Sequence, residues 1–398
     1  MTDLDSRREL GLLLLLTAVM FITIVDFMVL MPLSPYLMSQ FQVDPPRFGL
    51  LVSAYSLAAG AASLLAASIA DRYDRRHALL FTFAGLTVAT FGCALAVDFY
   101  TLLIARTVAG VFGGVIGSVV LAIVGDVVPP ARRGRAMGWV MLGFSLAAVA
   151  GVPLGLFLAE HHGWRAPFAV LAGASALVWL TVWRLVPAVR GHLAQAPTGL
   201  WQGYRELLAV PNHWWACGVT ALTMLSGFSV IPYISPSLVA NVGLDPRYLA
   251  WVYFVGGGAT LFTRPLVGRL VDRHRHAHVF AVLVLTSFVP IVLVTQTLPL
   301  PFAWQLLFST LFFVFVSGRF IPASSLVTGA TEARLRGRLM AFNSAVQNFA
   351  SGVAAFVAGW MMSQGPHGEL LGYGWVGLMS CAFGLAAIWV AYRVRAVS

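Results

Sequence analysis

Three ionisable residues lie deep inside apolar stretches of this sequence: Asp26, Arg106 and Arg319. A charge at the centre of a bilayer costs roughly 2.5–3.5 kcal/mol on insertion scales, so a residue of this kind needs a partner or a function. Asp26 and Arg106 are expected at comparable depths and could pair. The Asp26 carboxyl could then exchange a proton, bind a ligand directly, or form a fixed salt bridge that holds two helices together.

Arg319 lies in the segment Ser317–Pro322 and has no acidic neighbour in the sequence at a matching depth. Such a guanidinium could anchor a carboxylate, a phosphate or a hydroxylated ligand. It could equally bond to backbone carbonyls that the Pro322 break leaves free. The hydroxyl groups of Ser229 and Tyr233 are further candidates for ligand contact, although hydroxyls in apolar helices also bond between helices.

The composition defines the kind of protein that must position these residues. The chain has 398 residues, of which 59% are hydrophobic and 10% are charged, whereas soluble domains are about 45–50% apolar and about 25% charged. Soluble, disordered and disulfide-rich classes are therefore excluded, and an all-α polytopic membrane protein remains. Because one helical span needs about 20 apolar residues, we expect twelve transmembrane helices, at about 11–37, 48–70, 78–97, 100–124, 135–159, 166–187, 213–239, 249–270, 278–297, 302–326, 340–362 and 372–392.

The basic residues indicate how the chain crosses the membrane. All 25 are Arg; 19 fall in segments on the side of the N-terminus and three in segments on the opposite side. This bias predicts that both termini are cytoplasmic. It also assigns the net charge of +10 to membrane insertion and lipid headgroups rather than to nucleic acid. We expect a six-helix bundle at 1–189, a cytoplasmic linker at 190–212 and a second bundle at 213–398.

The two predicted bundles repeat each other at an offset of about 200 residues. The repeated elements are Pro32–Pro35 with Pro232–Pro236, Asp44-Pro45 with Asp245-Pro246, Asp71-Arg72 with Asp272-Arg273, and Arg133–Met137 with Arg336–Met340. Parallel repeats of six spans are typical of transporters with a central site between two pseudo-symmetric halves.

Several motifs give the sequence a specific resemblance. The segment Ala67–Arg76 resembles G-x-L-x-D-R-x-G-R-R, the loop signature of the major facilitator superfamily, with Ala67 and Asp74 in place of two glycines. Arg106 to Gly110 resembles the R-x-x-x-G element of that family. Four residues of the fifth span resemble its antiporter motif: Gly143, Gly151, Pro153 and Gly155. The stretch from Gly151 to Phe168 most resembles the drug:proton antiporter and sugar-efflux branch, which includes arabinose efflux permease-like proteins.

The resemblance implies roles for residues that composition leaves open. Spans 1, 4, 7 and 10 of this family line the transport cavity, which places Asp26, Arg106 and Arg319 toward the pathway. The loops would form a cytoplasmic gate in which Asp71 caps the start of span 11 near Gly337 and Asp272 caps the start of span 5 near Gly134. The implied gating residues are Asp71, Arg72, Arg75, Asp126, Asp272 and Arg273.

The sequence therefore predicts a secondary transporter that exports small organic molecules, drug-like or sugar-like, by proton antiport with rocker-switch alternating access. The alternatives are a facilitator or proton symporter that imports a small metabolite, and a non-transporting receptor or scaffold. We expect no enzyme activity, no cofactor and no metal, because no such constellation of residues is present. The expected partners are a small-molecule substrate, protons and the lipid bilayer. We expect the protein to be a monomer. We expect it to lie in the cell membrane, in a bacterium the inner membrane.

Overall fold

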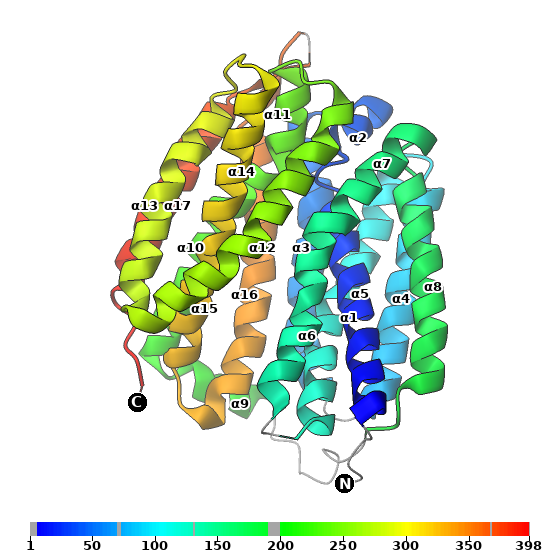
Figure 1. Ribbon diagram of the computed structural model, residues 1–398, viewed down its shortest axis with the longest axis vertical. Coiled ribbons are helices and arrows are strands. Elements are labelled where there is room, and N and C mark those ends of the chain that lie inside the picture. Colours follow the sequence, from blue (N-terminus) through cyan, green and yellow to red (C-terminus); the bar gives the residue numbers. More distant parts are fainter. Residues whose placement is uncertain (1–5, 70–72, 130–131, 190–199, 367, 398) are drawn as a thin grey trace.

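The computed structural model describes residues 6–69, 73–129, 132–189, 200–366 and 368–397. Its helices stand side by side along the long axis of the molecule (Figure 1). The first helix begins at the same end of the molecule at which the chain ends after the last helix. We call this the termini end. The opposite end is called the far end.

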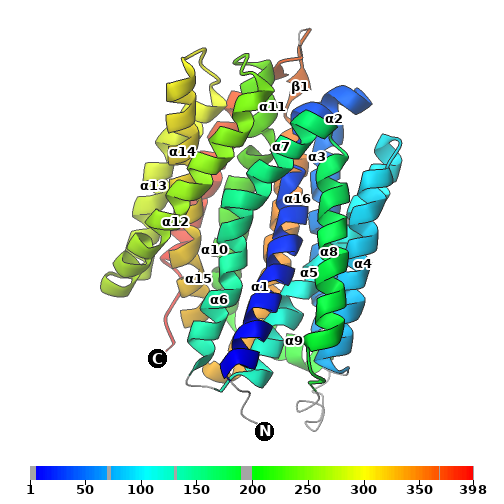
Figure 2. The same ribbon diagram turned by 45° about the vertical axis from the view of Figure 1, so that its right-hand side comes forward.

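The N-terminal half consists of helices that run alternately toward the far end and back. Its elements are α1 Ser6–Val29, α2 Ser34–Phe41, α3 Pro45–Ile69, α4 Arg75–Leu95, α5 Phe99–Val127, α6 Arg133–Leu146, the π-helix η3 Ala147–Gly151, α7 Val152–His162 and α8 Ala166–Leu185. A short helix, α9 Leu200–Leu208, connects this half to the next. In Figure 2, α9 lies near the termini end, below the long helices.

The C-terminal half repeats this alternation and ends in a small hairpin and a last helix. Its elements are α10 Pro211–Val230, the 3₁₀-helix η5 Ile231–Tyr233, α11 Ile234–Ala240, the 3₁₀-helix η6 Pro246–Tyr248, α12 Leu249–Arg273, α13 His276–Thr295, α14 Phe302–Gly318, α15 Phe320–Gly329, α16 Ala333–Trp360, β1 Ser363–Gln364, β2 Leu370–Leu371 and α17 Tyr373–Ala391. The two strands pair antiparallel, Ser363 opposite Leu371.

Within the described residues, ten helical segments are long and apolar enough to cross a membrane. These are 9–29, 45–65, 75–95, 99–127, 133–162, 166–185, 211–240, 276–295, 302–329 and 373–391. The 25-residue helix α12 and the 28-residue helix α16 are long enough but are not among them. Both helices carry several arginines, which lowers their mean hydropathy.

Capping residues begin and end the helices where the sequence supplies them. Asp98 begins α5: its carboxylate accepts from the Thr101 backbone N–H at 2.7 Å, and the Thr101 side chain completes the capping box. This hydrogen bond holds the pKa of the exposed Asp98 carboxyl below its usual range. Gly163 ends α7 at a φ of 83°, a left-handed conformation that a residue with a Cβ adopts only at a cost.

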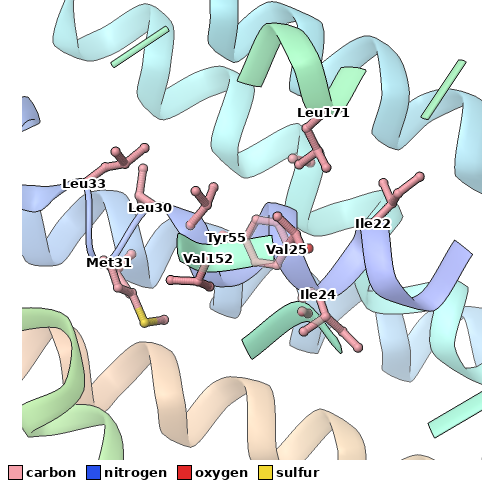
Figure 3. Packing of buried hydrophobic residues seen from close by; sticks show 14 of the residues in the cluster. Ile22, Ile24, Val25, Leu30, Met31, Leu33, Tyr55, Val152 and Leu171 are labelled. Atoms are coloured by element: carbon pink, nitrogen blue, oxygen red, sulfur yellow. The ribbon is translucent and has the colours of Figure 1, made fainter. Parts of the chain in front are cut away.

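Helix α1 forms the centre of the N-terminal core. Its Val25 lies beside Val152 of α7, and Leu171 of α8 approaches the same helix (Figure 3). A Cβ atom on Gly151 would overlap the Val25 side chain, so the glycine allows η3 to approach α1 closely. Moving one large apolar side chain from water into such a core stabilises the folded state by about 1.5–3 kcal/mol.

The most extensive contacts between the two halves are made by α3 and α12. Helix α3 packs against α16, and α12 packs against η3 and α7. At Gly257 of α12 a Cβ atom would lie 2.8 Å from the carbonyl oxygen of Ala148, so this crossing also depends on a glycine. Since η3 and α7 form the far-end part of their span, this contact lies away from the termini end (Figure 1).

Candidate functional site

A buried polar cluster lies in the N-terminal half and is built by α1, α4 and α5. The Asp26 and Arg106 side chains are 0% and 1% exposed, and Arg106 Nη1 lies 3.2 Å from Asp26 Oδ2. The same nitrogen donates to the Asp26 backbone oxygen at 2.9 Å. Thr90 Oγ1 donates to the other carboxylate oxygen at 2.8 Å. The carboxylate is therefore satisfied on both oxygens, once by a charge and once by a hydroxyl group.

An aromatic side chain covers the arginine of this cluster. The Arg106 guanidinium carbon lies 4.4 Å from the centre of the Tyr55 ring, a cation–π distance. Tyr55 belongs to α3, and a Cβ atom on Gly110 of α5 would overlap the Tyr55 backbone. The R-x-x-x-G element thus has a physical basis: its arginine pairs with Asp26, and its glycine lets α3 approach α5.

The cluster lies beside a contact between the two halves. Phe27 follows Asp26 directly, and its ring centre lies 5.3 Å from that of Tyr55 and 5.9 Å from that of Phe228. Phe228 belongs to α10 in the C-terminal half. The contact between Phe27 and Phe228 therefore joins α1, next to Asp26, to α10 of the other half.

The second buried charge, Arg319, lies at the junction of α14 and α15 in the C-terminal half and is 0% exposed. Its Nη1 donates to Ser287 Oγ at 3.5 Å, a long hydrogen bond. Its Nε and Nη2 atoms are buried and have no hydrogen-bond partner among the described residues. The structure therefore shows neither an acidic partner nor a bond from this guanidinium to backbone carbonyls in the part of the chain that it describes.

The two predicted hydroxyl residues are also buried, and both bond within the protein. Ser229 Oγ donates to the Ser226 backbone oxygen at 3.0 Å. Tyr233 Oη donates to the Ala355 oxygen of α16 at 2.8 Å and lies 3.4 Å from the Pro45 oxygen of α3. Tyr233 therefore lies in the contact between the halves near the far end, where α3 begins and α16 approaches its end.

Four of the six residues of the predicted gate are described by the structure, and they lie at the termini end. Arg75 Nε lies 3.3 Å from Asp126 Oδ2, so α4 and α5 are linked by an ion pair. Asp71 and Arg72 lie outside the described residues. Asp272 and Arg273 are exposed, and within the described chain no hydrogen bond or ion pair joins Asp272 to the start of α6 near Gly134.

The departure of the loop signature at Asp74 has a structural reason. Asp74 begins α4, and its Oδ1 accepts from the Arg76 backbone N–H at 2.9 Å and from the Val189 backbone N–H at 3.0 Å. The carboxylate thus ties the start of α4 to the chain beyond α8. Sequence comparison with the glycine of the signature does not reveal this role.

The short helix α9 also forms contacts that the sequence did not indicate. Glu206 forms ion pairs with Arg334 and with Arg338, the latter at 3.2 Å, at the start of α16. Tyr204 Oη donates to the Leu64 backbone oxygen of α3 at 2.8 Å. Helix α9 therefore holds one helix from each half at the termini end.

The antiporter-like residues pack one span against α1. A Cβ atom on Gly143 would lie 3.0 Å from the Thr17 backbone oxygen, and one on Gly155 would overlap the Val29 side chain. Pro153 stands at the beginning of α7, directly after the π-helix η3. A π-helix inside an α-helix is frequent at functional sites, and here it lies where the same span also contacts α12.

These features define a polytopic helical membrane protein with one buried polar site in each half. In the part of the chain that the structure describes, no group of three or more His, Cys, Asp or Glu could hold a metal ion. The sequence model of the Major Facilitator Superfamily matches residues 16–316 and 216–398. The chain belongs to this family.

Known proteins of the family resemble the chain in part or in full. It is 32% identical over 195 residues to the uncharacterized MFS-type transporter YceJ of Bacillus subtilis (strain 168), covering 49% of this chain and 50% of YceJ. It is 28% identical over 248 residues to a probable sugar efflux transporter of Helicobacter pylori (strain P12), covering 62% of each. The chain thus spans about half to three fifths of the length of these two relatives.

A solved structure resembles the chain over almost its whole length. The crystal structure of a bacterial homologue of the human lysosomal transporter Spinster, in an inward-facing and unoccupied conformation, has a TM-score of 0.76 to this protein. It is 17% identical and covers 98% of this chain and 97% of its own. The likeness shows that the two chains share the transporter fold.

Proposed function

We propose that this transporter exports small organic molecules, drug-like or sugar-like, in exchange for protons by rocker-switch alternating access. The observation that carries the proposal is the buried cluster of Asp26, Arg106 and Thr90. Asp26 is fully buried between helices, and its two oxygens have different partners. Protonation of Asp26 removes the charge that Arg106 balances, so binding of a proton and the geometry of α1 and α5 depend on each other.

The proposal includes a membrane arrangement. Ten spans, together with α12 and α16, give twelve transmembrane helices in bundles 1–189 and 213–398, joined by the linker 190–212. The arginine bias supports a cytoplasmic location of the termini end in a bacterial inner membrane. The transporter would act as a monomer, since each bundle contributes one buried charged site within a single chain.

The contacts between the halves support alternating access. Tyr233 and the crossing at Gly257 hold the halves together toward the far end. At the termini end, Asp272 is exposed and does not contact Gly134 in the described chain. This combination fits a state that is closed at the far end, in which the gate formed by Asp272, Arg273 and the paired Arg75 and Asp126 is not assembled. Asp71 and Arg72 complete the same proposed gate.

Export rather than import is supported by two further observations. The span that carries Gly143, Gly151, Pro153 and Gly155 contains the π-helix η3, and Ala148 of η3 contacts α12 of the other half. This fits a span that bends during exchange. A relative with 28% identity is named a probable sugar efflux transporter. Arg319 and Ser229 would supply polar groups in the C-terminal half for the transported molecule.

The experiment uses the full chain in proteoliposomes containing a pH-sensitive dye. Glucose, arabinose, D-glucuronate and ethidium serve as probes. Antiport predicts that an imposed proton gradient drives at least one probe uphill against the proton flow, and that Asp26→Asn abolishes uphill transport but keeps exchange of labelled for unlabelled probe. Asp98→Asn, which neutralises an exposed carboxylate, is the matched control. Flow of probe and protons in the same direction indicates a symporter, and accumulation equal to that in empty vesicles indicates a non-transporting protein.

A further inference from the structure

Arg319 is a buried arginine with two donors that share one edge of its guanidinium. Nη1 donates to Ser287 Oγ, whereas Nε and Nη2 are buried and have no partner among the described residues. The Nε–H bond and one Nη2–H bond point to the same side of the planar group. This two-pronged edge is the one with which arginine binds both oxygens of a carboxylate or phosphate.

We propose that Arg319 binds an anionic oxygen group of the transported molecule, so that the substrates are organic anions, with carboxylates foremost. This inference rests on the proposed transport function and narrows its substrate class. A single neutral hydroxyl offers one acceptor oxygen and no charge, whereas a carboxylate offers two oxygens and a full negative charge. The open edge of Arg319 matches the carboxylate in number of contacts and in charge.

A comparison within the molecule supports the need for an anion. Among the described residues, Arg106 and Arg319 are at most 1% exposed. Arg106 has a carboxylate 3.2 Å away. Arg319 forms no ion pair in the described chain, and its side chain hydrogen-bonds there to the neutral hydroxyl of Ser287. A buried charge without a counter-charge is strongly unfavourable. A substrate carboxylate would supply at Arg319 the compensation that Asp26 supplies at Arg106.

The position of Arg319 also fits a substrate contact. Its Nη2 faces α10 at Gly227, where a Cβ atom would lie 3.4 Å from this nitrogen. The next residue, Phe228, forms the aromatic contact with Phe27 of the N-terminal half at 5.9 Å. The open edge of Arg319 therefore lies against Gly227, next in sequence to the residue that contacts the N-terminal half. In alternating access, contacts between the halves separate and re-form as the central site changes sides.

The test measures binding to the purified full chain in detergent, without any proton gradient. Two matched pairs of probes differ only in the anionic group: D-glucuronate with D-glucose, and benzoate with benzyl alcohol. A ligand that binds the folded state raises the midpoint of thermal unfolding. We expect the carboxylate of at least one pair to bind about tenfold or more tightly than its neutral partner, which corresponds to about 1.4 kcal/mol.

Variants assign this preference to Arg319. Arg319→Gln should abolish it, and Arg319→Lys should weaken it, because an ammonium keeps the charge but lacks the planar edge. Arg47→Gln removes an exposed arginine at the far end and should leave the preference unchanged. Equal binding of the acidic and neutral probes by the wild type, or a preference that survives Arg319→Gln, overturns the proposal.

A second variant tests the missing counter-charge at Arg319 independently of any added probe. Ser287→Asp places a carboxylate where the serine hydroxyl already contacts Arg319. We expect a higher unfolding midpoint than in the wild type and about tenfold weaker binding of the carboxylate probe. A lower midpoint with unchanged binding contradicts the proposal. If the anion preference depends on Arg319 while Asp26→Asn still pumps uphill, proton antiport through Asp26 is wrong and the substrate class stands.

Discussion

Removing both partners of the Asp26–Arg106 pair should destabilise the protein no more than removing either partner alone. The two side chains are 0% and 1% exposed and lie 3.2 Å apart. Loss of one partner leaves an uncompensated buried charge and typically costs about 3–5 kcal/mol. We therefore expect Asp26→Ala and Arg106→Leu each to lower the free energy of unfolding by about that amount.

The double variant distinguishes a coupled pair from two independent residues. If the contributions were independent, the losses would add to about 6–10 kcal/mol. Because the double variant contains neither buried charge, we expect it to lose about as much as one single variant. The coupling is then about 3–5 kcal/mol, at or above the upper end of the usual range. Thr90 then keeps its hydroxyl group but loses an acceptor, which accounts for part of the remaining loss.

The assay is unfolding of the purified chain in mixed micelles with increasing sodium dodecyl sulfate, followed by tryptophan fluorescence. The same four proteins are compared in transport. If Asp26 carries the proton, the stable double variant still exchanges labelled for unlabelled probe but does not pump uphill. Additive losses would refute the coupling, and uphill pumping by the double variant would show that the pair is purely structural.

Four further outcomes are expected. Tyr233→Phe should weaken the contact between the halves at the far end by about 0.5–1.5 kcal/mol, the worth of one hydrogen bond. The distance between spin labels on the two halves at that end should become longer. Glu206→Gln should weaken the docking of α9 at the termini end by no more than about 1 kcal/mol, because its ion pairs are partly exposed. Distances between spin labels at that end should therefore change little. Gly110→Leu should prevent folding, since a side chain there overlaps the α3 backbone; the folded fraction in size-exclusion chromatography checks this. The pKa of Asp98 is lowered on folding by the Thr101 backbone N–H, so its stabilisation is present above the unfolded pKa and lost in acid; Asp98→Asn should lose this pH dependence of unfolding.

The sequence predicted the helical membrane fold because apolar runs and the arginine bias are strong signals. It also singled out Asp26, Arg106 and Arg319, since charges are rare in such runs. The ten apolar spans agree with that prediction, and the assignment of α12 and α16 as the remaining two spans stays a proposal.

The partners of these residues could not be predicted. Thr90 is one of many threonines in apolar helices, and its bond to Asp26 crosses 64 residues of sequence. Tyr233 has the spacing of a cavity residue, yet its hydroxyl group bonds to the backbone of α16. Glu206 reads as an ordinary linker acid, and its pairing with α16 depends on how α9 docks. Each of these contacts is set by packing between helices, for which one sequence contains no periodic signal.

If Asp26 carries the proton and Arg319 binds an anionic substrate, as proposed, the two sites together set how much work one exchange cycle can do. One elementary charge that moves through 100 mV releases about 2.3 kcal/mol, enough for a roughly 50-fold gradient of a neutral solute. If Arg319 selects a monoanion, one proton entering and one anion leaving carry two charges in the same electrical sense. The work doubles to about 4.6 kcal/mol and supports a gradient of about 10³-fold. An arginine that has no carboxylate of its own would thus favour substrates whose export the membrane potential already drives.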